Sequence, residues 1–291
     1  MSVGKRIGFG FLTIVPSAIV ILSQVVAGLI LSVNFMLENI DLQMILSADG
    51  QLSTEITKYM LAHNDLIVII YQGICLVAFG IWYFIAYGRK KKRALETPGS
   101  KIKLSKIGLV VLLGIMIQIS ISTIMALLQM VFPHILDEYL ELIQQAGLAE
   151  PTIITIISAA ILAPIVEELC FRGLTMRFAR VVWNKKWFYI TVQAALFGLI
   201  HLNLVQGLYA FVIGLLIGYI MDEFKSLWLC ILLHAVINSS SFVLDYLFVW
   251  VPSQFYNLAT ILFAVISTVS VVAIIIILGR GGKNESKAFH S

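Results

Sequence analysis

Residues 8–33 read GFGFLTIVPSAIVILSQVVAGLILSV and contain no charged side chain. A transmembrane helix needs about 20 predominantly apolar residues, so this segment is long enough to cross a bilayer. Lys5 and Arg6 precede it, as in a signal peptide, but the apolar run is too long for the core of one. We therefore interpret the segment as a retained first span.

The rest of the chain repeats this apolar pattern. Of its 291 residues, 60% are hydrophobic and only 12% are charged, and the mean hydropathy is +0.97. These values lie far from those of a soluble domain. The sequence predicts an all-α, polytopic transmembrane bundle of about eight spans, with no room for a separate soluble domain. The expected spans are 8–33, 65–87, 107–132, 151–171, 188–202, 207–221, 227–246 and 256–278. The fifth and sixth are short and close together in sequence, so a tight hairpin or a partly re-entrant pair is the alternative for them.

The charged residues predict how this bundle is oriented. The segments 88–106 and 171–187 are rich in Lys and Arg, whereas 34–64 and 133–150 are mainly acidic. Because cytoplasmic loops carry the excess of positive charge, we expect both termini in the cytoplasm, which agrees with an even number of spans. The net charge of +4 then reflects topology and contact with the lipid bilayer, so we expect no nucleic-acid partner.

Few ionisable residues fall inside the predicted spans, and such residues are functional candidates by default. Glu167 and Glu168 lie in the fourth span, with Arg172 at its end. Glu168 and Arg172 are four residues apart and share a helix face, so they can pair. Glu167 is rotated by about 100° from Glu168 and is left free to act as a general base. A structural clamp at the helix end would explain Glu168 and Arg172 but not Glu167.

Two further pairs of residues four apart lie in neighbouring spans. Phe197 and His201 end the fifth span, and His234 and Asn238 lie in the seventh. Scattered burial would cost each polar group its hydration, so we expect these groups around one wet cavity. His201 would then orient a water for Glu167, while His234 and Asn238 would donate to an oxyanion. This set predicts hydrolysis of an amide by activated water.

A metal site is the competing use of these side chains. Two His and one Glu can bind Zn²⁺ and leave a position for water. However, the chain has no His-Glu-x-x-His pattern and no third imidazole in a span. We therefore predict no metal ligands and no cofactor, with Zn²⁺ as the less favoured alternative.

Three short patterns occur in order on these helices: Glu167-Glu168-x-x-x-Arg172, Phe197-x-x-x-His201 and His234-x-x-x-Asn238. They resemble the three motifs of the CPBP family, the CAAX prenyl protease and bacteriocin-immunity (ABI) proteins. The resemblance covers roughly 150–246 and implies a glutamate-dependent intramembrane endopeptidase with its site in a cavity open toward the cytosol. It implies Glu167 as base assisted by His201, and His234 and Asn238 as the oxyanion-hole pair. Glu168 and Arg172 would support the site, and Phe197 would pack near it.

The resemblance also organises the chain. We expect a variable N-terminal part at 1–149, a CPBP-like catalytic core at 150–246, and a final span with a cytoplasmic tail at 247–291. A GxxxG pattern in the sixth span, Gly214 to Gly218, predicts close helix packing.

The leading hypothesis is an intramembrane protease that cuts a membrane-bound or lipidated peptide or protein. A non-catalytic immunity or adaptor protein that binds a peptide or a sensor kinase is the alternative from another class. A transporter with Glu167 as a proton relay is weaker, because we see no paired broken helices. We expect an integral, multi-pass protein, located in the cell membrane if the chain is bacterial.

Overall fold

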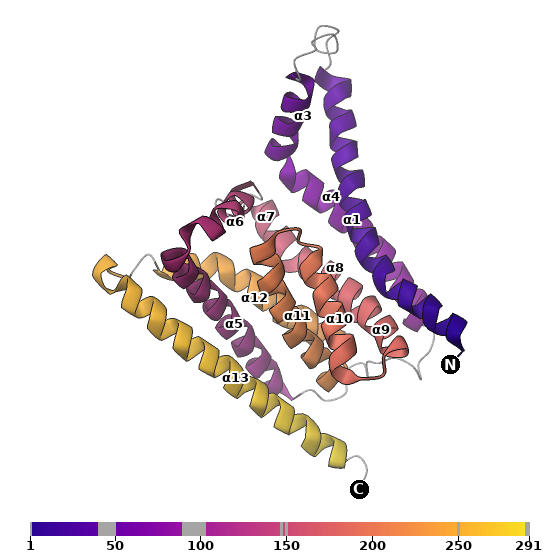
Figure 1. The fold of residues 1–291 in the computed structure, drawn as a ribbon, viewed down its shortest axis with the longest axis vertical. Coiled ribbons are helices and arrows are strands. Elements are labelled where there is room, and N and C mark those ends of the chain that lie inside the picture. Colours follow the sequence, from indigo (N-terminus) through magenta and orange to yellow (C-terminus); the bar gives the residue numbers. More distant parts are fainter. Residues whose placement is uncertain are drawn as a thin grey trace.

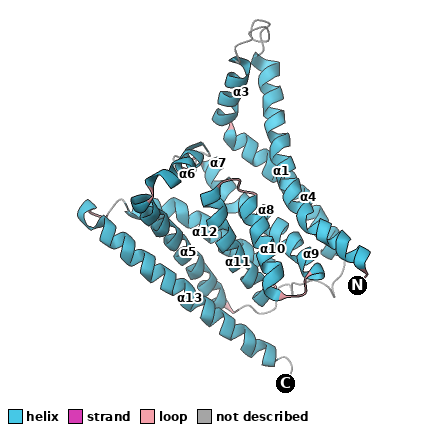
Figure 2. Cartoon of the chain, viewed as in Figure 1, coloured by secondary structure: helices cyan, strands magenta, loops and turns pink. Residues whose placement is uncertain are grey.

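The computed structural model describes residues 2–39, 51–88, 103–145, 148, 151–248 and 251–288. These residues form helices joined by short turns, and no strand occurs among them (Figure 2). The prediction of an all-α bundle is therefore confirmed. The longer helices are α1 (Val3–Asn39), α3 (Gln51–Ala62), α4 (Asn64–Tyr83), α5 (Leu104–Val131), α6 (Pro133–Gln145), α10 (Lys186–Leu199), α11 (Leu204–Phe224), α12 (Leu227–Phe248) and α13 (Tyr256–Ala288).

Seven helical segments of the described chain are long and apolar enough to cross a membrane. They correspond to seven of the eight expected spans and confirm an integral multi-pass membrane protein. The exception is the expected span 188–202, which is the 14-residue helix α10. At 1.5 Å per residue, α10 is about 21 Å long and falls short of the roughly 30 Å hydrocarbon core. It ends at a turn and packs back along α11 (Figure 1).

Figure 1 shows how the helices are grouped. Helices α1, α3 and α4 form one side of the molecule, and α5 and α13 lie together along the opposite side. Helices α10, α11 and α12 and the fourth span lie between these groups. The start of α1 and the end of α13 both lie toward the lower edge of the view. Their cytoplasmic location stays a prediction from the charge pattern.

The fourth span is a continuous helical rod that contains two π-helical segments. It runs through α7 (Ile153–Ile157), the π-helical η2 (Ser158–Leu162), α8 (Ala163–Glu168), the π-helical η3 (Leu169–Thr175) and α9 (Met176–Val182). Short π segments inside α-helices occur often at functional sites. Here they flank the turn that carries the two adjacent glutamates.

Pro164 explains why the carbonyl of Ala159 lacks a hydrogen-bond partner in the π-helical register of this rod. In η2 the Ala163 N–H donates to the Ser158 carbonyl, five residues back. The next bond of this register would reach the Ala159 carbonyl from residue 164, which is Pro164 and has no N–H. The Ala159 carbonyl is therefore open to a partner from another helix.

Candidate active site

The centre of the candidate site is a buried ion pair within the fourth span. Arg172 Nη1 donates to Glu168 Oε1 over 2.6 Å, and neither side chain has exposed surface. A buried pair needs further polar contacts to offset the loss of hydration. Arg172 Nη2 donates to the Gly214 carbonyl of α11 over 3.2 Å, and the guanidinium lies 5.0 Å from the centre of the Phe197 ring. The pair therefore joins the fourth span to α10 and α11.

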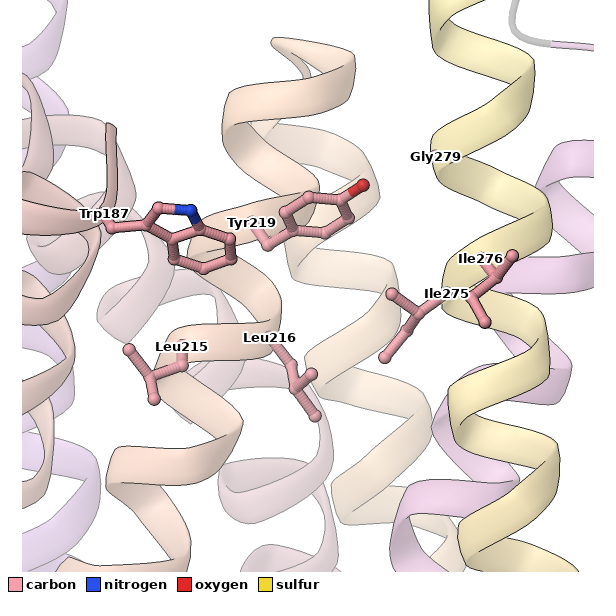
Figure 3. Close-up of a pocket in the computed structure, with 7 residues that line it drawn as sticks. All are labelled: Trp187, Leu215, Leu216, Tyr219, Ile275, Ile276 and Gly279. Carbon is pink, nitrogen blue, oxygen red and sulfur yellow. The ribbon is translucent and has the colours of Figure 1, made fainter. Parts of the chain in front are cut away.

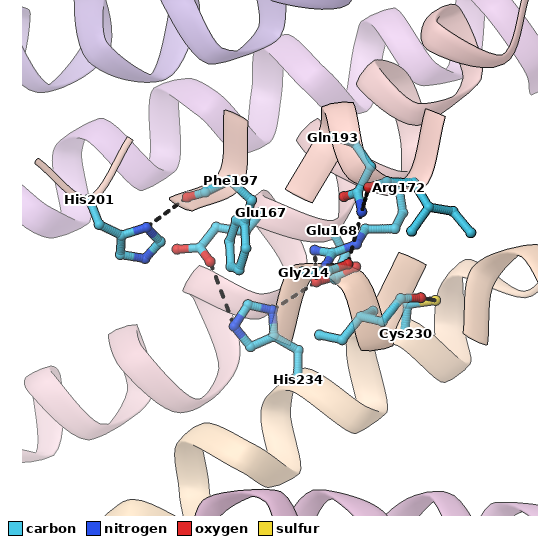
Figure 4. Close-up of polar contacts among 11 residues, drawn as sticks. Glu167, Glu168, Arg172, Gln193, Phe197, His201, Gly214, Cys230 and His234 are labelled. Carbon is cyan, nitrogen blue, oxygen red and sulfur yellow. Dashed lines mark hydrogen bonds and ion pairs between the residues drawn. The ribbon is translucent and has the colours of Figure 1, made fainter. Parts of the chain in front are cut away.

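His234 of α12 lies between the two adjacent carboxylates (Figure 4). Its Nδ1 is 2.8 Å from Glu168 Oε1, and its Nε2 is 3.6 Å from Glu167 Oε2. Because the carboxylate of Glu168 accepts, Nδ1 carries the proton and Nε2 is directed at Glu167. Glu168 thus holds both Arg172 and His234 on one oxygen. The pair of Glu168 with Arg172 that their spacing predicted is present, and His234 adds a second contact to Glu168.

Glu167 differs from Glu168 in its surroundings. Its side chain is 19% exposed, whereas that of Glu168 is fully buried. In Figure 4 the carboxylate of Glu167 lies between the rings of His201 and His234. Tyr71 of α4 and Tyr209 of α11 also lie close enough to interact electrostatically with it. Glu167 is the acidic group of this cluster that solvent or a substrate can reach.

His201 has a defined tautomer. Its Nδ1 is 2.8 Å from the Phe197 carbonyl, which can only accept, so Nδ1 is the protonated nitrogen. In the neutral ring the other nitrogen, Nε2, has a lone pair that can accept a hydrogen bond. Phe197 fixes the geometry, because its ring contacts both imidazoles edge-on, with centroids 5.2 Å from His201 and 5.8 Å from His234.

Asn238 lies one helical turn beyond His234 and contacts the fourth span. Its Nδ2 donates to the Ala159 carbonyl over 2.9 Å, the acceptor that Pro164 leaves open. The amide nitrogen has two N–H groups, so this bond orients the side chain and leaves one donor available.

The structure therefore brings the predicted residues from three elements into one region. Figure 4 shows Glu167, Glu168 and Arg172 of the fourth span beside Phe197 and His201, from α10 and the turn after it, and His234 of α12. Asn238 lies one turn beyond His234 on α12 and contacts the fourth span at Ala159. Their catalytic roles stay predictions. Among the described residues, no group of three His, Cys, Asp or Glu side chains is arranged to hold a metal ion.

Sequence reasoning missed Gln193. This fully buried residue of α10 donates to the Gly214 carbonyl that Arg172 also contacts. One signal could have revealed it, since Gln193 is an amide inside an apolar helix, four residues before Phe197 and on the same face.

A separate cavity of about 410 Å³ lies between α11 and α13, with Trp187 and Tyr219 at one end (Figure 3). Its walls are mainly aliphatic, and none of the predicted site residues lines it. Leu215 and Leu216 face this cavity, whereas the preceding Gly214 faces Gln193 and Arg172. The cavity is therefore distinct from the glutamate and histidine cluster.

The fold and this cluster together define a multi-pass membrane protein with an acid–imidazole site between its helices. Residues 149–240 match the family described as type II CAAX prenyl endopeptidase Rce1-like. The match confirms the resemblance to CAAX proteases and supports an intramembrane endopeptidase in general. No curated protein and no solved structure matches the chain significantly.

Proposed function

We propose that this protein hydrolyses a peptide bond of a membrane-associated or lipidated protein, using water activated by Glu167. The observation that carries the proposal is the position of His234, between the buried Glu168 and the accessible Glu167. Glu167 and Glu168 both lie within 3.6 Å of the His234 ring, but their surroundings differ. The Glu168 carboxylate is an anchor with a cation beside it, and the Glu167 carboxylate is partly exposed.

The groups suit a two-step hydrolysis. Glu167 takes a proton from a water whose other hydrogen is directed at the bare Nε2 of His201, and the water oxygen attacks the peptide carbonyl carbon. The free N–H of Asn238, and Nε2 of His234 when it carries a proton, donate to the oxyanion that forms. Glu167 then passes its proton to the amide nitrogen as the C–N bond breaks. The immediate products are a carboxylic acid and an amine, and Glu167 is again a carboxylate. The acid then loses its proton and the amine gains one, so the final carboxylate and ammonium balance in atoms and charge.

Surroundings of low polarity strengthen this mechanism. Phe171, Phe197 and Leu233 are buried around the cluster, and electrostatic interactions in such surroundings are stronger than in water. The family match supports a lipid-modified C-terminal peptide as the substrate class. Such a peptide would place its cleavage bond at a membrane-embedded site while the lipid stays in the bilayer.

Glu167→Gln tests the proposal with the least change in shape. General-base catalysis contributes about 10²–10⁴-fold to a rate, so we expect cleavage to fall by that factor or below detection. The measurement is hydrolysis of an internally quenched, farnesylated CAAX peptide by purified protein in detergent. The same peptide without the farnesyl group tests the need for a lipid. Glu55→Gln is the matched control, because Glu55 pairs with Lys58 on α3 outside the site.

Full activity of Glu167→Gln would refute the mechanism. Tight binding of the farnesylated peptide by wild-type protein, without cleavage at any pH tested, would favour the non-catalytic adaptor. Activity that is lost with chelators and restored by Zn²⁺ would require a metal-dependent mechanism instead.

A further inference from the structure

Gln193 is a buried amide that none of the three sequence motifs includes. Its side chain has no exposed surface, and Nε2 donates to the Ile190 carbonyl over 2.9 Å and to the Gly214 carbonyl over 2.8 Å. The amide nitrogen must face the two carbonyls, because a flipped amide would place its own oxygen against the two carbonyl oxygens. The orientation of Gln193 is therefore determined by its neighbours.

The Gly214 carbonyl connects this amide to the candidate site. It accepts from Gln193 Nε2 and from Arg172 Nη2. Arg172 in turn donates to Glu168, and the same carboxylate oxygen accepts from His234. An unbroken series of contacts thus leads from Gln193 to the ring that faces Glu167 (Figure 4).

The GxxxG pattern of α11 makes room for this amide. A Cβ added to Gly218 would lie 2.5 Å from Gln193 Nε2, and one added to Gly214 would lie 3.0 Å from Ala194 Cα. Both distances are too short for a carbon contact. The glycines therefore allow α10 to approach α11 closely enough for the amide to reach a backbone carbonyl.

Packing alone does not explain an amide at this position. Gln193 Oε1 is buried and has no hydrogen-bond partner among the described residues. An unsatisfied buried acceptor costs about 1–3 kcal/mol, and a side chain such as Met would fill similar space without that cost. The two N–H donors are what distinguish glutamine from methionine here.

We propose that Gln193 is a positioning residue, which acts through the Gly214 carbonyl to fix the Arg172 guanidinium and, through Glu168, the ring of His234. The hydrogen bond from Gln193 Nε2 holds the Gly214 carbonyl in the orientation in which it also accepts from Arg172. Without it, the guanidinium and the carbonyl can move together, and the ring between the two glutamates loses a fixed anchor. The cleavage experiment below rests on the proposed function, whereas the NMR experiment on the His234 ring does not.

The first test needs no substrate. In protein labelled with ¹⁵N-histidine, we expect Gln193→Met to shift the ring-nitrogen resonances of His234, assigned with His234→Gln. Gln118→Met is the matched control, because Gln118 donates locally to Ser122 on α5. It should leave the His234 signals in place. Unchanged His234 resonances in folded Gln193→Met would overturn the proposal, whatever the substrate is.

The second test uses cleavage of the farnesylated CAAX peptide. Misplacing a catalytic group by about 1 Å can cost roughly 100-fold in rate, so we expect kcat of Gln193→Met to fall by about 10- to 100-fold, with KM within about twofold. A stable fold with unchanged kcat would contradict the proposal. If wild-type protein does not cleave the peptide, the proposed function fails for this substrate, and the NMR result still decides the role of Gln193.

Gln193→Glu separates positioning from packing and remains informative if Gln193→Met does not fold. A protonated carboxyl can donate to the Gly214 carbonyl, whereas an ionised carboxylate cannot. The activity of Gln193→Glu relative to wild type should therefore rise as the pH falls, and its His234 signals should approach those of wild type. A ratio that stays low even at acidic pH, where the carboxyl is protonated, would show that the donor at this position does not matter.

Discussion

The buried ion pair between Glu168 and Arg172 gives a prediction about stability. Both side chains are completely buried, with 2.6 Å between Oε1 and Nη1. Removing one member of such a pair typically costs about 3–5 kcal/mol, because the other charge remains without compensation. In Glu168→Gln the guanidinium keeps only neutral partners, the Gly214 carbonyl and the ring of Phe197 among them. We therefore expect the free energy of unfolding to fall by about 3–5 kcal/mol.

The double variant Glu168→Gln/Arg172→Met tests whether the loss of stability comes from an uncompensated buried charge. It removes both members of the pair, so neither is left as an uncompensated buried ion. Its loss of stability should therefore be smaller than the sum of the two single losses by at least about 2 kcal/mol. Equal double and summed losses would mean that the two side chains act independently.

The chain contains its own reporters for this measurement. The thiols of Cys75, Cys170 and Cys230 are buried, so a thiol-reactive dye in detergent reports thermal unfolding. At about 2–4 °C per kcal/mol, Glu168→Gln should lower Tm by roughly 6–20 °C. Glu167→Gln is the control, because its partly exposed side chain should cost less than about 1 kcal/mol. A loss of under about 1 kcal/mol for Glu168→Gln would refute the assignment of a charged, buried pair.

Three further predictions concern α10 and its surroundings. Gly198→Ala places a Cβ 2.6 Å from the Gly207 carbonyl, so unfolding should become easier by about 1–3 kcal/mol and peptide cleavage should slow, as a Tm and a rate assay would show. Leu202 has a φ of 53° and is 80% exposed, so Leu202→Gly should stabilise the protein by about 0.5–1 kcal/mol; an unchanged or lower Tm would contradict this. Partial burial lowers the pKa of Lys186, but its hydrogen bond to Asp222 and nearby carboxylates outweigh burial and raise the pKa above 10.5. The stabilisation by Lys186 should therefore persist through neutral pH and disappear as the pH rises through the raised pKa. We expect Lys186→Gln to lower Tm at pH 8 but not at pH 12. An equal loss of Tm at both pH values would contradict the ion pair as the source of the stabilisation.

The local pattern of the sequence was sufficient for the spans. Long apolar runs predict helices that cross a bilayer, because backbone groups in lipid must bond within their own segment. It was insufficient for α10, whose residues are as apolar as those of a longer span. The turn at Ile200–Asn203 ends α10 early, and close contact with α11 at Gly198 and Gly207 allows it to stay short.

In the candidate site, too, the sequence pattern was sufficient for contacts within one helix and insufficient for contacts between helices. Spacing of four residues was enough to pair Glu168 with Arg172, because residues four apart on a helix are neighbours. No spacing rule connects residues on different helices, so the position of His234 between Glu167 and Glu168 came only from the folded bundle. The bond from Asn238 to the Ala159 carbonyl likewise depends on a change of helical register that Pro164 accompanies.

By itself, the sequence determined that this protein is a membrane-embedded helix bundle with a few ionisable groups in its apolar spans. Composition and periodicity decide this because lipid tolerates few alternatives. The tertiary structure placed His234 between the two carboxylates, made Glu168 fully buried and Glu167 partly exposed, and added Gln193 to the supporting network. The physical reason is that burial and hydrogen bonding between helices depend on side-chain contacts over distances in sequence such as the 66 residues between Glu168 and His234.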